Sequence, residues 1–247
     1  MVLNLKMIKT GCVSFALFAL SAAPASAQMT WTDRAFLNVN FGVQEVSHTL
    51  DTSSTFDLYG ESGTLATTQP IDGGALFDIG AGYKVWKNLA VGLGYSRVQS
   101  DGDAAIAANV PDPNFFDRHR GLTGVASNAE HAEHAIHLQG TWVMPVTDKM
   151  DVGFSFGPTI FMVSQDVPTA ISVTEPAPTL SSTTITREKK TTVGVNLGID
   201  VNYFFRPRIG AGLLARYAFG SADLDSSSDS LGLGGFQIGF GLRYRFK

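Results

Sequence analysis

The stretch GFQIGFGLRYRF, residues 235–246, alternates large apolar residues with glycine or polar residues. Side chains of a β-strand point in turn to its two faces, so one face of this strand is entirely apolar. The other face carries glycines together with Gln237, Arg243 and Arg245. A transmembrane barrel turns its apolar residues toward lipid and its polar or small residues toward a lumen. The stretch therefore predicts a strand of such a barrel.

Seven earlier segments show the same alternation, each close to the ~9–11 residues that a tilted membrane strand needs. They are residues 37–44, 77–85, 89–96, 135–144, 151–162, 193–203 and 209–218. The predicted fold is therefore all-β, an eight-stranded antiparallel up-and-down transmembrane β-barrel.

The connections between these segments alternate between short and long. Residues 86–88, 145–150 and 204–208 predict tight turns, and residues 47–74, 99–131, 165–191 and 220–234 predict long polar loops. Outer-membrane barrels keep short turns in the periplasm and long loops outside, which places both termini in the periplasm. Thr55 to Leu65 is open to two interpretations. It is either a ninth strand or a hairpin that extends the first outer loop, and an even strand count favours the hairpin.

The first residues have the features of a secretory signal. Lys6 and Lys9 precede an apolar stretch, and Ala25-Ser26-Ala27 forms an A-x-A cleavage site. A transmembrane anchor is the alternative, but Pro24 and the small residues after it disfavour one. We expect a signal peptide at residues 1–27, a periplasmic lead-in at 28–34 and the barrel at 35–247.

Composition excludes several classes of function. The only cysteine, Cys12, lies inside the expected signal, so the mature chain has no thiol chemistry. Without Lys6 and Lys9 the net charge falls from −4 to −6, which does not favour nucleic acid as a partner. No stretch after the signal is long and apolar enough for a helical span. The sequence gives no indication of a cofactor.

The strand pattern and the terminal residues Gly-Leu-Arg-Tyr-Arg-Phe resemble the small eight-stranded outer-membrane barrels of Gram-negative bacteria, of the OmpA, OmpX and OmpW type. The resemblance covers nearly all of residues 33–247. It implies that Tyr244 and Phe246 form the C-terminal aromatic signal for the barrel-assembly machinery. Phe246 is followed by Lys247, a departure from the pattern in which the aromatic residue is terminal.

An eight-stranded barrel has an interior just wide enough to be filled by side chains, so a wide pore is not expected. The predicted luminal charge network is Asp78, Lys84, Glu133, His137, Asp200, Arg216, Arg243 and Arg245, joined by Asp151. Counted from the strand ends, Asp200 lies level with Arg243, and Glu133 with Arg216. Such charges need partners in a narrow space. They predict either a salt-bridged plug or a narrow polar path.

Two patterns resemble catalytic or metal chemistry. Residues 153–157 match G-x-S-x-G, but a nucleophile elbow needs a strand-to-helix turn and this motif lies within a strand. Ser155 with His137 would be the pair to consider in a lipid-modifying enzyme, to which the family resemblance also extends. His131 and His137 share the inner face about 20 Å apart, and His134 points outward, which disfavours a metal cluster.

The outer loops carry acidic groups and a few basic ones, which either meet lipopolysaccharide phosphates or are simply solvated. We expect Phe115, Phe116 and Ile106 in the second loop to be exposed, which predicts a contact with a surface partner or a small apolar solute. Three functions remain. The first is a non-enzymatic structural or surface-interaction protein of the outer membrane. The second is an OmpW-like narrow transporter of small apolar solutes. The third is a lipid-modifying enzyme.

Overall fold

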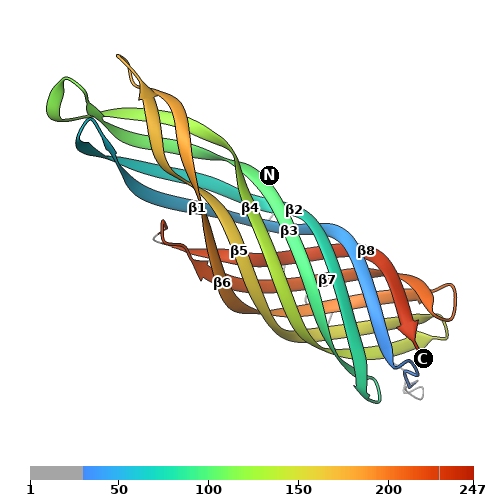
Figure 1. The fold of residues 1–247 in the computed structure, drawn as a ribbon. Helices are drawn as coiled ribbons and strands as arrows, with labels where there is room; N and C mark the ends of the chain where they lie inside the picture. Colours follow the sequence, from blue (N-terminus) through green and yellow to red (C-terminus); the bar gives the residue numbers. More distant parts are fainter. Residues whose placement is uncertain (1–29, 228) are drawn as a thin grey trace, which may run out of the picture.

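The computed structural model describes residues 30–227 and 229–247, and these residues form eight antiparallel strands in one closed barrel (Figure 1). The strands are β1 (Ala35–Leu58), β2 (Glu61–Trp86), β3 (Leu89–Asp112), β4 (Phe115–Thr147), β5 (Met150–Thr174), β6 (Thr179–Phe204), β7 (Ile209–Asp223) and β8 (Ser230–Phe246). The predicted fold class and strand count are confirmed. The expected signal peptide at residues 1–27 lies outside the described residues.

The barrel closes between its first and last strands. Ala35 pairs with Phe246, and the ladder continues to the pair Glu45 and Phe236. Each remaining strand pairs with its neighbours in the chain, so the topology is up-and-down. The described start of the chain and its C-terminus therefore lie at the same end of the molecule.

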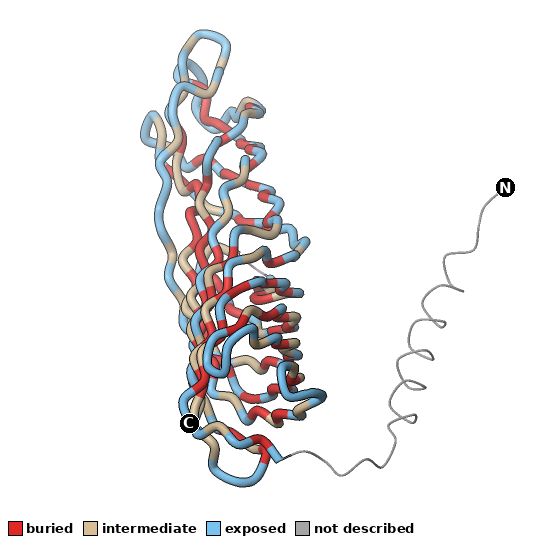
Figure 2. The backbone as a smooth tube through the Cα atoms, turned by 90° about the vertical axis from the view of Figure 1, so that its right-hand side faces the viewer, coloured by how far each residue is buried: buried red, intermediate tan, exposed pale blue. Residues whose placement is uncertain are grey.

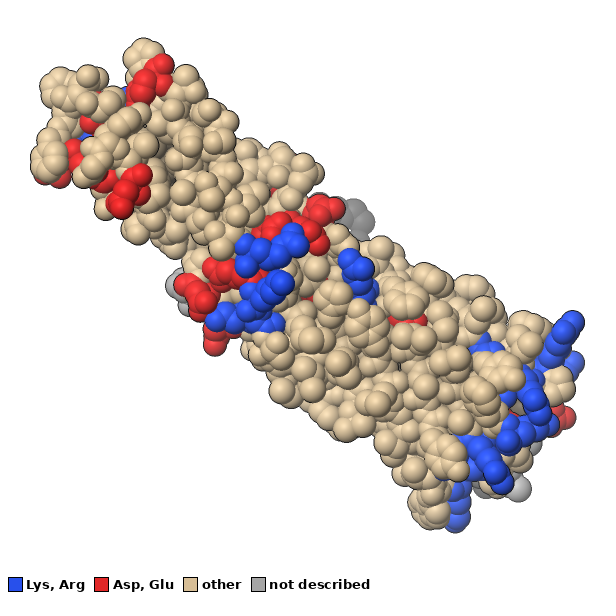
Figure 3. Space-filling view, viewed as in Figure 1, with Lys and Arg blue, Asp and Glu red and all other residues tan. Residues whose placement is uncertain are grey.

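A band of exposed apolar side chains surrounds the half of the barrel that contains this end. On β8, Phe240 is 60 % exposed and Leu242 is 65 % exposed, while Arg243 on the opposite, luminal face is 1 % exposed. Figure 3 shows the band free of charged groups over most of its width, with basic residues at one border and mixed charges at the other. Side chains that are apolar outside and charged inside fit a lipid surround, so the chain is a transmembrane barrel. Among the described residues no helix is long and apolar enough to cross a membrane.

The strands continue far beyond this band, which corrects the expected long loops at 47–74, 99–131, 165–191 and 220–234. The pair Leu58 and Glu61 closes the β1–β2 hairpin, so Thr55 to Leu65 is the hairpin and not a ninth strand. The turns that remain are short, as at Tyr59-Gly60. Figure 1 shows the hairpins β1–β2, β3–β4 and β5–β6 running past the end of β7–β8.

The polarity of the two faces reverses in this extension, which is why the sequence pattern did not predict it. Inside the extension lies a buried apolar cluster of Phe56, Leu65, Ala104, Ile106, Ala108, Val110, Leu122, Ala126 and Ile171. The expectation that Ile106 is exposed is wrong, because it is 3 % exposed in this cluster. Outward residues such as Asp51 and Asp57 are exposed and polar. The extension thus follows the rule of a soluble sheet, with an apolar interior facing away from water. Figure 2 shows buried and exposed residues alternating along the strands.

The extension has two layers. Above the pair His131 and Gln165, β4 pairs only with β3, and β5 pairs only with β6. The β5–β6 hairpin packs instead across the β1–β4 sheet: Ile171 joins its apolar cluster and Leu180 lies partly buried against it. We call the β5–β6 hairpin together with the upper β1–β4 sheet the cap.

Candidate functional site: the lumen and its two ends

Arg243 on β8 lies in the part of the lumen nearer the termini. Its Nη2 contacts Oδ1 of Asp200 on β6 at 2.7 Å, which is the pairing expected from their heights. The guanidinium also donates to Asn40 at 2.6 Å and to Asn202 at 2.5 Å. The Arg243 side chain is fully buried, so these neutral and charged acceptors replace the water it has lost.

Arg216 on β7 forms the next level. Its Nη2 contacts Oδ2 of Asp78 on β2 at 2.7 Å, across the barrel, and its Nε donates to Gln237 at 2.6 Å. Asp78 also accepts from Asn40 at 2.8 Å, so the Arg216 level and the Arg243 level share one hydrogen-bonded network. A cavity of about 30 Å³ lies among these side chains.

The expected pairing of Glu133 with Arg216 is wrong. Glu133 accepts from Gln44 at 3.2 Å, lies 3.1 Å from Nε2 of His131, and accepts the backbone N–H of Gly234 at 3.1 Å. Gly234 and the residue after it have φ of 83° and 141°, a left-handed backbone that glycine adopts without strain. This bend brings the β8 backbone to Glu133. Adjacent strands are staggered, so residue counts from the strand ends did not predict the partner.

The three histidines of β4 have separate hydrogen-bond partners among the described residues. His137 is fully buried between Ser96 and Thr159, at 3.0 and 2.8 Å, and no hydrogen bond joins it to Ser155 within the described residues. Residues 153–157 lie inside β5, as the sequence predicted. His134 lies on the outer side at 2.7 Å from the Tyr95 hydroxyl. Between residues 30 and 247, Ser228 excepted, no cluster of His, Cys, Asp or Glu has the arrangement of a metal site.

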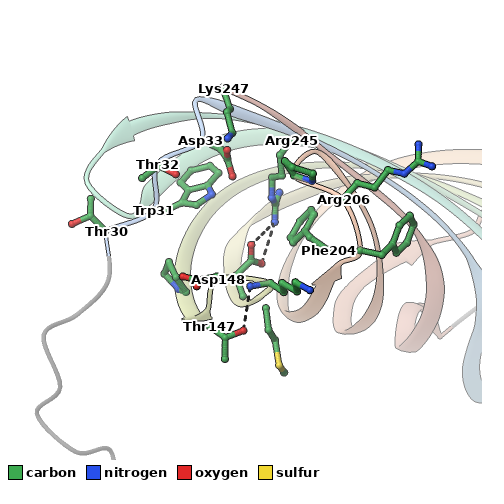
Figure 4. Close-up of a pocket in the computed structure, with 16 residues that line it drawn as sticks. Thr30, Trp31, Thr32, Asp33, Thr147, Asp148, Phe204, Arg206, Arg245 and Lys247 are labelled. Atoms are coloured by element: carbon green, nitrogen blue, oxygen red, sulfur yellow. Dashed lines mark hydrogen bonds and ion pairs between the residues drawn. The ribbon is translucent and has the colours of Figure 1, made fainter.

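Arg245 lies at the end of the lumen near the termini, beside a cavity of about 490 Å³ (Figure 4). Its Nη2 contacts Asp151 at 3.1 Å, and its guanidinium lies 5.1 to 5.7 Å from the rings of Trp31, Phe36 and Phe204. Such cation–π contacts stabilise a charge that has little access to water. We call this region the mouth.

Trp31 is the main residue of the mouth that the sequence did not predict. It lies in the expected lead-in, yet it is 3 % exposed and packs with Phe36, Ala90 and Val143. Its backbone is fixed from β2, because Lys84 Nζ donates to the Trp31 carbonyl at 2.7 Å. Lys84 therefore holds the lead-in in place, and the described residues give it no ion-pair partner in the lumen. Burial raises the pKa of the neighbouring Asp33.

The tips of the three long hairpins are tied together at the far end of the cap. Glu175, in the β5–β6 turn, accepts from both terminal nitrogens of Arg120 on β4, at 2.8 and 2.5 Å, and from the Tyr59 hydroxyl at 3.1 Å. The hydrogen bond from Arg120 holds the pKa of Glu175 below its usual value. Phe116, near the start of β4, has 86 % of its surface exposed.

A second junction lies where the cap meets the barrel. Arg187 on β6 contacts Asp166 at 2.7 Å and Glu130 at 2.6 Å, and Lys190 contacts Asp225 at 2.7 Å. The hydrogen bond from Arg187 lowers the pKa of Asp166. Figure 3 shows a belt of mixed charges between the apolar band and the cap.

Tyr244 and Phe246, expected to be an assembly signal, lie on the outer face of β8 beside the mouth. Their ring centroids are 4.7 Å apart in an edge-on arrangement. Phe246 is 45 % exposed, so its ring is directed to the surroundings of the barrel.

No family model matches the chain, and no curated protein matches it. Among solved structures it is similar to the outer membrane protein OprG from Pseudomonas aeruginosa, at 10 % identity over 90 % of this chain and 99 % of that one, with a TM-score of 0.46. It is also similar to Neisserial surface protein A, at 11 % identity over 86 % and 97 % of the two chains, with a TM-score of 0.44. A third is the outer membrane protease OmpT from Escherichia coli, at 10 % identity over 88 % and 98 %, with a TM-score of 0.42.

Proposed function

We propose that this chain is a non-enzymatic outer-membrane barrel that is closed to solutes and acts through its surface, as a structural envelope protein or a surface-interaction protein. The observation that carries the proposal is the pairing of luminal charges across the barrel, at the levels of Arg216, Arg243 and Arg245. Each arginine reaches a carboxylate on another strand, and the space left among the two upper pairs is about 30 Å³. A cavity needs about 10–15 Å³ of such volume to hold one water, so this space admits a few waters at most.

The cap supports the second half of the proposal. An apolar interior and tied hairpin tips give it a defined shape outside the membrane, and Phe115 and Phe116 are presented at its end. Exposed aromatic residues on a rigid support are typical of contact surfaces. The outer partner would meet the protein at this end.

The membrane partners follow from the two borders of the apolar band. At the outer border, Arg187, Lys189 and Lys190 are positioned to meet lipopolysaccharide phosphates, and neighbouring carboxylates to share divalent cations with them. At the opposite end we place both termini in the periplasm, with Tyr244 and Phe246 as the signal for the barrel-assembly machinery. Residues 1–27 would be the cleaved signal peptide.

Conductance in planar bilayers tests the closed lumen. We expect the purified protein to be nearly silent under conditions in which a general porin, as a control, conducts steadily. A steady nanosiemens-level channel from the wild type would overturn the closed lumen and put the narrow transporter of small apolar solutes in its place.

A further inference from the structure

An apolar groove of about 640 Å³ runs along the outer wall of β1, β2 and β3 near the mouth. Its floor is made of small residues. Ala81 faces outward between Leu37 and Leu93, its register partners on the two neighbouring strands, and Gly82 and Gly92 lie beside it. A single alanine between two leucines leaves a channel between their side chains.

The mouth end of the groove is bordered by rings and then by cations. Tyr83 and Phe246 line this end, and Ala35 lies between them as the register partner of both. Arg34 precedes Ala35 in the chain and Lys247 follows Phe246. Both are exposed, and Lys247 also lines the mouth together with Asp33. The groove therefore passes from an apolar wall to a basic border within one residue.

Basic residues gather at this end of the barrel on the face seen in Figure 3. The exposed cations of this end are Arg34, Lys87, Lys149, Arg206, Arg208 and Lys247. Asp148 is exposed there and Asp33 is half-buried, so the positive charges are in clear excess. Clusters of lysine and arginine next to a bilayer attract anionic lipid headgroups.

We propose that the groove is a binding site for one anionic phospholipid of the periplasmic leaflet. An acyl chain lies over Ala81 between Leu37 and Leu93, and the headgroup phosphate meets Arg34 and Lys247. Tyr83 and Phe246 occupy the interfacial level, where aromatic rings are favoured. The inference rests on the membrane insertion and the orientation proposed above, and adds to them a specific lipid and its site.

Native mass spectrometry of the protein, released from nanodiscs of phosphatidylcholine with a minor share of phosphatidylglycerol, tests the site. We expect the wild type to retain one phosphatidylglycerol in preference to phosphatidylcholine. Ala81→Phe fills the groove with a side chain that lipid tolerates and should abolish this retention. Arg34→Gln with Lys247→Gln should reduce the preference about tenfold or more, since each cation near an anionic surface contributes on the order of 1 kcal/mol.

Two matched controls separate this site from general attraction. Ala215→Phe adds the same bulk at an outward position of β7, away from the groove. Arg206→Gln with Arg208→Gln removes two cations from the β6–β7 turn. Both controls should retain the lipid as the wild type does. Equal loss of lipid retention in the controls, or no preference for phosphatidylglycerol in the wild type, would overturn the site.

A heat-dependent gel shift, recorded for every sample, shows whether the barrel has folded. Failure of the wild type to fold would count against membrane insertion itself.

Discussion

Phe240 lies on the outer face of β8 and has 60 % of its surface exposed, in the middle of the apolar band. We expect Phe240→Arg to destabilise the folded barrel by ~2–4 kcal/mol, because a charge at the bilayer midplane is costly. Urea unfolding in lipid vesicles measures this change.

Thr55→Arg is the matched control for that substitution. Thr55 faces outward on β1 like Phe240 on β8, but it lies in the cap among polar neighbours. We expect no measurable change in unfolding. An equal loss of unfolding free energy at the two positions would show that the lipid boundary assigned here is wrong.

Arg243 gives a second prediction at this scale. Arg243→Ala leaves Asp200 without its partner, and breaking a buried pair in this way costs about 3–5 kcal/mol. The double variant Arg243→Met with Asp200→Leu should recover a large part of the loss, because no charge then remains unpaired. The two midpoints of urea unfolding give the comparison, and a double variant as unstable as the single one would show that the ion pair is not the cause.

The β5–β6 hairpin gives the prediction that belongs to the scale of elements. Arginine partners lower the pKa values of Glu175 and Asp166 below their ordinary values of 4.5 and 3.8. A carboxyl with a lowered folded pKa contributes stability above its unfolded pKa and loses it as the pH falls through the folded value. We therefore expect the hairpin to be held on the β1–β4 sheet at pH 7 and to loosen below about pH 4.

Spin labels on Asn109→Cys in β3 and Ser181→Cys in β6 report this movement as a distance distribution. It should be narrow at pH 7 and broad at pH 3. Glu175→Gln removes one of the charge-assisted contacts, so the distribution should already be broader at pH 7. A distribution that stays narrow at pH 3 would show that apolar packing alone holds the hairpin.

The sequence predicted the eight membrane strands because lipid and lumen impose one regular alternation, as in residues 235–246. It did not predict the cap, where apolar residues such as Leu50, Phe56 and Leu65 lie on the inner face and polar residues on the outer face. It predicted the pair of Asp200 and Arg243, but not that of Arg216 with Asp78, which depends on the stagger of distant strands. Trp31 belongs to no periodic segment, and only the folded mouth shows its contacts.

At the scale of the whole molecule, the far part of the cap has an apolar cluster of its own, separate from the cluster of Leu50, Phe161 and Leu233 at the junction with the barrel. Replacing residues 168–185 by Asn-Gly joins Val167 to Thr186, which are register partners, through a tight turn. The apolar cluster around Phe56 and Ile106 then loses its cover. We expect increased binding of a dye specific for apolar surface, with the heat-dependent gel shift unchanged. Loss of the gel shift would mean that the cap is needed for the barrel to form.

The placement of Arg243 and Arg245 on the last strand bears on the order of events in folding. β8 supplies the counterions of Asp200 and Asp151, which stand on β6 and β5. A ring closed early between β7 and β1 would enclose these two carboxylates without their arginine counterions, which disfavours closure of an incomplete chain. The barrel is therefore expected to close only after β8 has joined the sheet. A chain that ends at Asp229 should remain open to protease when presented to vesicles, and its protection would refute this order.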